Sequence, residues 1–390
     1  MYQRELEHEA TILSQHFPIL TIFGPRQSGK TTLVKKIFPD KPYVNLEHLP
    51  TRSFASEDPV RFIQRYANGA IFDEIQRAPE LLSYLQVLVD EQKKEGLFIL
   101  TGSHQLRLQE AVSQSLAGRT AILTLLPLSL SECSQDGNTY TANKQILLGG
   151  YPRLREISLA PHKYYSAYCQ TYVERDIKLL INIKDLSLFQ RFMRLCAGRI
   201  GCVFNASELA SELGTSSHTI MQWVSALEAS FLIFKLPPYF ENIGKRLIKS
   251  PKLYFTDLGL ACYLLGIDNE TQLERDPLRG HLFENLVVLE LMKAHYNKGL
   301  EPHMYFYRDH GQLEIDVVIQ QGSELIPIEI KSSSTFHRDF LKNLKKFQTL
   351  THRTIQDSYL IYNGDIEQKI NDIDIIHYAQ TATILERKRD

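Results

Sequence analysis

The chain has 390 residues, a length that predicts two or three domains. Its formal net charge of −1 excludes a uniformly basic surface for binding nucleic acid but is compatible with a local basic face. Its five cysteines contain no C-x-x-C pair, so we expect free thiols rather than a structural zinc site. The charged start is unlike a secretory signal and no apolar run approaches the ~20 residues of a membrane helix, so we expect a cytoplasmic protein without membrane segments.

Residues 24–31 spell G-P-R-Q-S-G-K-T and fit the phosphate-loop pattern G-x-x-x-x-G-K-[ST]. The apolar residues 19–23 predict a buried strand before the loop, and residues 31–38 predict a helix after it, with its N-terminus toward the loop. In such a loop, backbone N–H groups surround the phosphates of ATP, Lys30 reaches the β- and γ-phosphates, and Thr31 binds Mg²⁺. The expected ATP-binding residues are Gly24, Pro25, Arg26, Gln27, Ser28, Gly29, Lys30, Thr31 and Thr32.

Two further strands of the same sheet are predicted after the loop. Residues 42–46 predict one of them and are followed by a helix near residues 59–66. The second is the apolar run 70–72, which ends in Asp73 and Glu74. Because ligands of parallel sheets lie beyond the carboxyl ends of the strands, we expect both acids at the phosphate site. Asp73 would hold Mg²⁺, and Glu74 would act as the general base toward water.

Residues 97–103 predict the next buried strand, which ends in small polar residues. Ser103, or alternatively Thr101, would orient water near the γ-phosphate. A second interpretation is that these residues cap a helix beginning at His104. We therefore treat Ser103 as a candidate catalytic residue.

Hydrolysis also needs positive charge opposite the γ-phosphate in the transition state. Candidate arginines are Arg119, Arg153 and Arg26, the last within the phosphate loop itself. If the arginine comes from a neighbouring copy of the chain, the active form is a homo-oligomer.

The middle of the chain shows a helix-turn-helix pattern. Residues 161–188 predict helix, and residues 205–213 predict a short helix that ends at Gly214. A second helix is expected from residue 217 to about residue 230, and residues 231–236 predict the first strand of a wing.

The start of the second helix carries the candidate DNA contacts Ser217, His218 and Gln222. This helix contains no Arg or Lys, which disfavours attraction to phosphates, and many such modules serve only protein packing. A nearby basic cluster would supply the missing charge, and its members are Lys245, Arg246, Lys249 and Lys252.

Two adjacent strands are predicted in the last third of the chain, at residues 314–319 and 326–331. Alternation places Glu329 and Lys331 on one face, which Asp316 of the neighbouring strand shares. These carboxylates, with Glu284 of the preceding helix, would bind Mg²⁺, and Lys331 would support a water nucleophile. The alternative is that Glu and Lys simply alternate on an exposed strand.

The sequence resembles a prokaryotic family of AAA-type P-loop ATPases. The resemblance rests on residues 24–32, 72–76, 100–103, 116–119, 127–129 and 149–152 of the first part, and it continues through residues 254–259, 283–285, 307–309, 314–316 and 328–331. The family carries a C-terminal domain of unknown function that looks like a winged helix followed by a PD-(D/E)XK nuclease-like fold.

The resemblance implies an α/β protein in three parts. A P-loop ATPase domain with a parallel sheet would span residues 1–150, a helical connector with a winged helix residues 151–245, and a small restriction-endonuclease-like α/β domain residues 246–390.

We therefore expect a Mg²⁺-dependent ATPase whose nucleotide state controls how its later domains engage DNA. Three functional classes stay open: an ATP-regulated DNA nuclease, a DNA-binding regulatory ATPase with a silent nuclease fold, and a signalling or chaperone-like ATPase that acts on protein partners.

Overall fold

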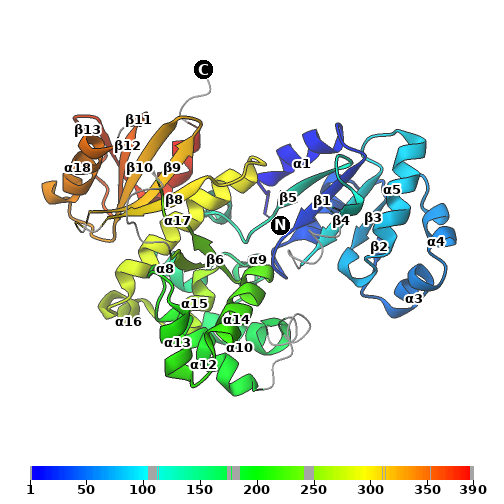
Figure 1. The fold of residues 1–390 in the computed structure, drawn as a ribbon, viewed down its shortest axis with the longest axis horizontal. Helices are drawn as coiled ribbons and strands as arrows, with labels where there is room; N and C mark the ends of the chain where they lie inside the picture. Colours follow the sequence, from blue (N-terminus) through cyan, green and yellow to red (C-terminus); the bar gives the residue numbers. More distant parts are fainter. Residues whose placement is uncertain are drawn as a thin grey trace.

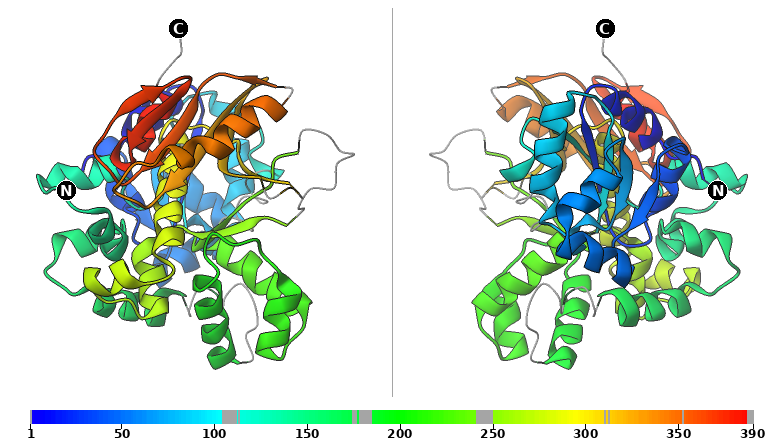
Figure 2. Two further views of the ribbon diagram at one scale, coloured as in Figure 1. Left: turned by 90° about the vertical axis from the view of Figure 1, so that its left-hand side faces the viewer. Right: turned by 90° about the vertical axis from the view of Figure 1, so that its right-hand side faces the viewer.

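The computed structural model describes residues 2–103, 112, 114–173, 177, 185–240, 250–309, 311, 313–351 and 353–386. Three parts follow one another along the chain (Figure 1). A sheet flanked by helices lies on one side, a helical lobe projects below, and a second sheet lies on the other side. The two perpendicular views show the helical lobe as a separate projection from the rest (Figure 2).

The first sheet is a five-stranded parallel sheet in the order β2-β3-β4-β1-β5. Its strands are β1 (Ile19–Phe23), β2 (Tyr43–Asn45), β3 (Ala70–Asp73), β4 (Phe98–Gly102) and β5 (Thr120–Thr124). β1, β3 and β4 are buried along their whole length, as their continuous apolar runs predict for strands covered on both faces. The expected P-loop sheet is confirmed.

Helices cover both faces of this sheet. Its helices are α1 (Leu6–Ser14), α2 (Lys30–Ile37), α3 (Leu49–Glu57), α4 (Pro59–Arg65) and α5 (Leu81–Gln92). Leu20 and Ile22 pack with α1 and α2, whereas Phe72 and Phe98 pack with α4 and α5. Alternate residues of each strand therefore pack into separate hydrophobic cores on the two faces of the sheet, which hold the sheet between them.

The middle of the chain is mainly helical. Its helices are α7 (Leu130–Cys133), α8 (Ala142–Leu148), α9 (Pro152–Glu156), α10 (Pro161–Tyr168), a π-helical turn (Cys169–Val173), α12 (Leu186–Ala197), α13 (Ala206–Leu213) and α14 (Ser217–Ala229). Within the stretch 161–188, which the sequence predicts to be helical, residues 174–176 and 178–184 lie outside the described residues.

The two helices of the helix-turn-helix pattern are present as α13 and α14. Asn205 caps α13 through its side chain, and Ser216 caps α14 in the same way. Gly214 ends α13 at φ +65°, a backbone conformation that a side chain disfavours. β6 (Ile233–Leu236) follows and pairs with β7 (Lys252–Phe255) in an antiparallel ribbon. The boundary expected between residues 245 and 246 therefore lies between two paired strands.

The last part contains a larger mixed sheet. Its helices are α15 (Leu258–Leu265), α16 (Glu270–Arg275), α17 (Arg279–Asn297) and α18 (Lys342–Leu350). The strand order is β13-β14-β12-β10-β9-β8, with β11 beside β10. The strands are β8 (Met304–Arg308), β9 (Glu314–Gln321), β10 (Glu324–Lys331), β11 (Thr354–Ile355), β12 (Ser358–Tyr362), β13 (Gln368–Ile370) and β14 (Ile373–His377).

Helix α17 joins this sheet to the first domain, and in Figure 1 it crosses the centre of the molecule. Lys293 donates from Nζ to the backbone oxygen of Leu128 (2.8 Å) and forms an ion pair with Glu290 (2.8 Å). A second link lies nearby, where Gly150 donates its N–H to the buried Asp257 (2.8 Å). No helix within the described part of the chain is long and apolar enough to cross a bilayer.

Candidate nucleotide site

The phosphate loop leaves β1 through a backbone path that requires glycine. Gly24 has φ +156°, and a Cβ at this position would lie 2.1 Å from the backbone oxygen of Leu125. Gly29, at φ +98°, forms the N-cap of α2. The two glycines of the G-x-x-x-x-G-K pattern are thus fixed by one close approach and one left-handed conformation. They bring the N-terminus of α2 to the carboxyl end of β1.

Lys30 is buried, and its side chain folds back over the loop. Its Nζ donates to the backbone oxygens of Gly24 and Pro25, both at 2.8 Å. These two bonds hold the charged ammonium group beside the loop.

Asp73 collects hydroxyl groups from three other elements. Thr31 of α2 donates to its Oδ2 at 2.9 Å, and Tyr43 of β2 donates to the same oxygen at 2.5 Å. Thr101 of β4 donates to Oδ1. Burial and the hydrogen bond to Asp73 raise the pKa of Tyr43, so the phenol remains a donor at neutral pH. The sequence predicted that Thr31 and Asp73 act together, and the structure brings them into direct contact.

Glu74 follows in a left-handed conformation, with φ +59°. This conformation is uncommon for a residue with a side chain, and such strain is often found at functional sites. The Glu74 carboxylate accepts hydrogen bonds from Gln76 and from Ser103 (3.1 Å). Ser103 therefore contacts the expected general base. The alternative role of this segment, capping a helix from His104, lies outside the described residues.

A cavity of about 370 Å³ opens beside the loop. It is lined by Tyr2, Arg4, Glu7, Arg26, Gln27, Gly29, Lys30, Thr31, Thr32, Leu33, Lys36, Glu74, Pro152, Arg153, Glu156 and Tyr172. Six of the nine expected ATP-binding residues belong to this lining. The cavity is large enough to be a ligand site and carries charged groups of both signs.

The three candidate arginines occupy different places. Arg119 precedes β5, and its backbone oxygen accepts from the N–H of Ile19, at the opposite end of β1 from the loop. Its guanidinium is bound to Asp90 at 2.6 and 2.8 Å. Arg119 therefore lies at the amino edge of the sheet, away from the loop of its own chain, and its role as the arginine supplied to a neighbouring copy stays a prediction. Arg153 and Arg26 both line the cavity.

Several contacts were missed because no motif marks them. Tyr164 of α10 donates to Oε1 of Gln27 in the loop (2.6 Å). Arg26 binds Glu47 at 3.2 Å and lies over the ring of Tyr172. The sequence did offer one signal for these contacts. Tyrosines at residues 164, 168 and 172 are spaced four residues apart, which places them on one face of a helix.

The acidic residues of the last part form a second polar cluster. Lys331 forms an ion pair with Glu329 at 2.7 Å, and Asp316 accepts the N–H of Ile330 at 2.7 Å. Burial is the main cause that raises the pKa of Asp316 to about 6 and that of Glu329 to about 8, and neighbouring carboxylates add to both shifts. The expected shared face of the two strands is thus occupied by groups that resist ionisation.

Lys252 of β7 enters the same cluster from the middle of the chain. Its Nζ lies 3.0 Å from Glu284 and 2.7 Å from Glu314, and its side chain is 4% exposed. Tyr254 also donates to Glu284 (2.5 Å). The three surrounding carboxylates, including Asp316, raise the pKa of Lys252 despite its burial, so the ammonium stays charged.

This arrangement can be compared with the expected metal site. Among the described residues, no group of three or more His, Cys, Asp or Glu side chains is arranged to hold a metal ion. The Mg²⁺ site expected from Glu284, Asp316 and Glu329 stays a prediction. In the structure Lys252 forms ion pairs with Glu284 and Glu314, and Lys331 forms one with Glu329.

The candidate DNA contacts lie on the surface. Ser217, His218 and Gln222 are exposed at the start of α14. Of the expected basic cluster, Lys252 is buried among carboxylates. Lys245, Arg246 and Lys249 lie outside the described residues.

Comparison with known proteins defines the class of the first domain. The model of the AAA domain family matches residues 16–134. Two domains of unknown function match the remainder, DUF8612 at residues 140–271 and DUF4143 at residues 279–381. The front of the chain is therefore an AAA-type P-loop ATPase domain. The winged-helix and nuclease-like interpretations of the later parts stay predictions.

Relatives that match most of the chain define the family to which it belongs. An uncharacterised protein of Mycobacterium tuberculosis is 32% identical over 325 residues, which cover 82% of this chain and 71% of that protein. A Mycobacterium bovis protein matches with the same identity and coverage. This chain belongs to the family of these proteins. A Haemophilus influenzae protein is 24% identical over 400 residues, covering 92% of each chain.

Two solved structures are also similar. The Walker-type ATPase PABY2304 of Pyrococcus abyssi aligns with a TM-score of 0.43 and 16% identity, covering 68% of this chain and 96% of that one. AMPPCP-bound DnaA from Aquifex aeolicus aligns with a TM-score of 0.30 and 14% identity, covering 57% and 86%.

The buried acids of the second cluster predict a pH-dependent stability. Because the folded-state pKa of Glu329 is raised to about 8, its contribution favours folding at low pH and is lost as the pH rises through that value. We therefore compare the free energy of unfolding of Glu329→Gln with that of the native protein. The difference in favour of the variant should grow by on the order of 1 kcal/mol as the pH rises from about 5 to about 8.5. Urea denaturation followed by circular dichroism measures this. Glu324→Gln on the same strand is the control, and an equal gain there would contradict the assignment.

Proposed function

We propose that the protein is a Mg²⁺-dependent ATP hydrolase. The observation that carries the proposal is the contact of Thr31 with Asp73 beside a cavity that Lys30 and Glu74 also line. Polyphosphate would lie against the N-terminus of α2, where the backbone N–H groups and the helix dipole favour negative charge. Lys30 would exchange its bonds to the loop for bonds to the β- and γ-phosphates.

The residues at the loop fit a magnesium ion. Thr31 and Asp73 offer hydroxyl and carboxylate oxygens, which are the ligands Mg²⁺ prefers, and they are held together by a hydrogen bond. When bound, Mg²⁺ would supply charge that neutralises the β- and γ-phosphate oxygens. Tyr43 and Thr101 would keep the Asp73 carboxylate oriented toward this place.

Glu74 is the group suited to accept a proton from the attacking water. It lines the cavity, and its carboxylate is held by Ser103 and Gln76. In this proposal Ser103 orients Glu74 rather than the water itself. Arg153 of α9 lines the cavity, and its side chain makes no hydrogen bond or ion pair among the described residues, so it is the arginine suited to the γ-phosphate.

The two proposed roles predict different kinetic defects. Lys30→Ala should lower kcat/KM for ATP by about 10²-fold or more, because it removes the ammonium group that would stabilise both bound ATP and the transition state. Glu74→Gln should lower kcat by about 10²-fold or more while ATP still binds, because only proton transfer is lost. Steady-state phosphate release and binding of a fluorescent ATP analogue distinguish the two.

Lys94→Ala is the matched control, since Lys94 is an exposed lysine on the far side of the sheet. It should keep full turnover. Normal hydrolysis by the Lys30→Ala protein would refute the site.

We further propose that the nucleotide state controls DNA engagement through α13 and α14, without DNA cleavage. The capped helix–turn–helix and the exposed Ser217, His218 and Gln222 support contact with DNA. The Lys252 ammonium among the carboxylates favours a non-cleaving C-terminal domain, because it supplies the positive charge that a catalytic metal would bring.

This proposal predicts DNA binding without cutting. Duplex DNA should bind with an affinity that falls as salt rises and that differs with and without ATP, and it should stay intact with Mg²⁺ or Mn²⁺. The double variant His218→Ala, Gln222→Ala should weaken binding by about 30-fold or more, since each lost contact costs about 1 kcal/mol or more. Fluorescence anisotropy and gel electrophoresis are the measurements.

Ser211→Ala on the exposed side of α13 serves as the control for this surface. Strand cleavage that disappears in Asp316→Ala would instead establish a nuclease. Absence of any DNA binding at low salt would favour an ATPase that acts on protein partners.

A further inference from the structure

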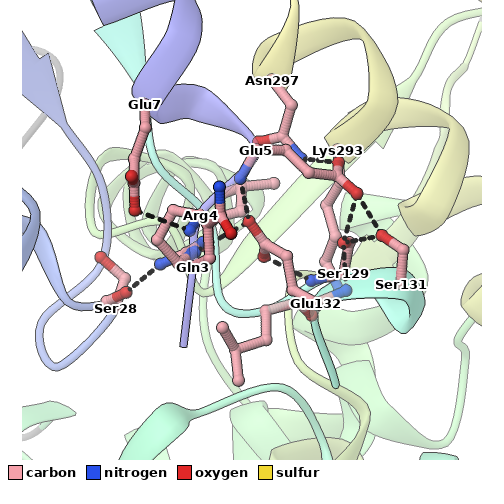
Figure 3. Close-up of polar contacts among 12 residues, drawn as sticks. Gln3, Arg4, Glu5, Glu7, Ser28, Ser129, Ser131, Glu132, Lys293 and Asn297 are labelled. Carbon is pink, nitrogen blue, oxygen red and sulfur yellow. Dashed lines mark hydrogen bonds and ion pairs between the residues drawn. The ribbon is translucent and has the colours of Figure 1, made fainter. Parts of the chain in front are cut away.

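The segment just before α1 lies between the phosphate loop and helix α17. Figure 3 shows Arg4 at the centre of this region, with Ser28 of the loop on one side and Glu132 on the other. The Arg4 guanidinium donates from Nη1 to the backbone oxygen of Ser28 (2.6 Å), from Nη2 to that of Leu126 (2.6 Å), and from Nε to Glu132 (2.9 Å). One side chain thus holds three separate parts of the ATPase domain.

The ion pair inside this cluster is almost fully shielded from water. The Arg4 side chain is 6% exposed and that of Glu132 is 0% exposed. Glu132 is fixed in turn, because it accepts the N–H groups of Glu5 (2.7 Å) and Ser129 (2.9 Å). A buried pair of this kind is costly to desolvate, and removing one partner leaves an uncompensated charge. Its geometry is therefore fixed by several bonds at once.

The bond to Ser28 has a direct consequence for the loop. In a trans peptide, the C=O and the following N–H point in opposite directions. Because Arg4 holds the Ser28 oxygen on its own side, the Gly29 N–H is turned the opposite way. Gly29 and Arg4 both line the cavity, and the Gly29 N–H is the group of this peptide that we expect to face a bound phosphate. The side chain of Arg4 lies against the same turn, 3.5 Å from the position a Gly29 Cβ would take.

The same segment is anchored on α17. The Glu5 carboxylate accepts from Asn297 Nδ2 (2.7 Å) on the last turn of that helix and from the hydroxyl of Ser131. Glu5 therefore connects the residue that holds the loop to a helix of the C-terminal part (Figure 3).

We infer that Arg4 is a positioning residue of the nucleotide site, that it sets the direction of the Ser28–Gly29 peptide for phosphate binding, and that the Glu5–Asn297 contact with α17 supports it in this role. The inference rests on the proposed ATP hydrolysis. It assigns to the start of the chain a part in nucleotide binding that the phosphate-loop pattern does not include.

The test compares Arg4→Gln and Arg4→Lys with the native full-length protein. Lysine keeps the charge but cannot donate to three acceptors that lie in different directions, so both variants lose the three hydrogen bonds of the guanidinium group. The KM for ATP should rise about tenfold in both, as expected for loss of a charge-assisted hydrogen bond, while kcat at saturating ATP changes by less than about threefold. The rise in melting temperature on adding ATP should shrink accordingly.

Arg61→Gln is the control, because Arg61 is an exposed arginine of α4 whose side chain makes no hydrogen bond or ion pair within the described residues. A wild-type KM in folded Arg4→Gln and Arg4→Lys proteins, with only a lower melting temperature, would show a mere structural brace and overturn the inference. If neither variant folds, Glu132→Gln decides, since it keeps one acceptor oxygen for Arg4 but removes the charge. A raised KM there supports the role of Arg4, and an unchanged KM contradicts it.

Asn297→Ala tests the support from α17. It should raise the KM for ATP by about two- to threefold. The effect is small because the variant loses a single hydrogen bond, between the Asn297 amide and the Glu5 carboxylate, and both groups are partly exposed to water. An unchanged KM would remove α17 from the inference. Lack of ATP turnover by the native protein would refute the proposed function itself, whereas turnover with a native KM in every variant would refute only this inference.

Discussion

The parallel alignment of β1, β3 and β4 is the constraint on which the candidate site depends. It places the phosphate loop, Asp73 and Thr101 at one edge of the sheet, where their side chains meet. The Asp73 carboxylate then joins three elements through hydroxyl donors. A buried carboxylate needs such partners, because unpaired it would carry a large desolvation cost. The carboxylate oxygens that accept these hydrogen bonds are therefore the same atoms that would bind a cation.

Local pattern was enough to predict this edge of the sheet. The apolar runs ended at polar residues, and parallel strands bring their carboxyl ends together, so Asp73, Glu74 and Ser103 followed from the sequence. Tyr43 and Arg4 did not. Arg4 meets Glu132 across 128 positions of the chain, and no periodicity encodes that distance. The place of Arg119 did not follow either, because β5, which begins directly after it, was not predicted from the sequence.

The C-terminal cluster shows a different limit of sequence patterns. An E-x-K strand beside an aspartate predicts a metal site because carboxylates gathered in an apolar sheet need a cation. The structure meets that need with Lys252, which comes from a strand far earlier in the chain and pairs with Glu284 and Glu314. The pattern correctly indicated converging negative charge. It contained nothing about the source of the balancing charge, because β7 reaches the cluster only through tertiary packing.

Helix α17 takes part in both polar clusters and connects their chemistry. Glu284 in its first half pairs with Lys252, and Asn297 at its end binds Glu5 beside the phosphate loop. These two residues are 13 positions apart, or about 20 Å along a helix at 1.5 Å per residue. Because a buried helix of this length moves as a unit, a displacement of the Arg4 region by bound nucleotide would shift Glu284 relative to β7. The carboxylates around Lys252 are close enough to one another that such a shift changes their mutual repulsion, so we expect the C-terminal part to respond to nucleotide through charge rather than through a flexible linker.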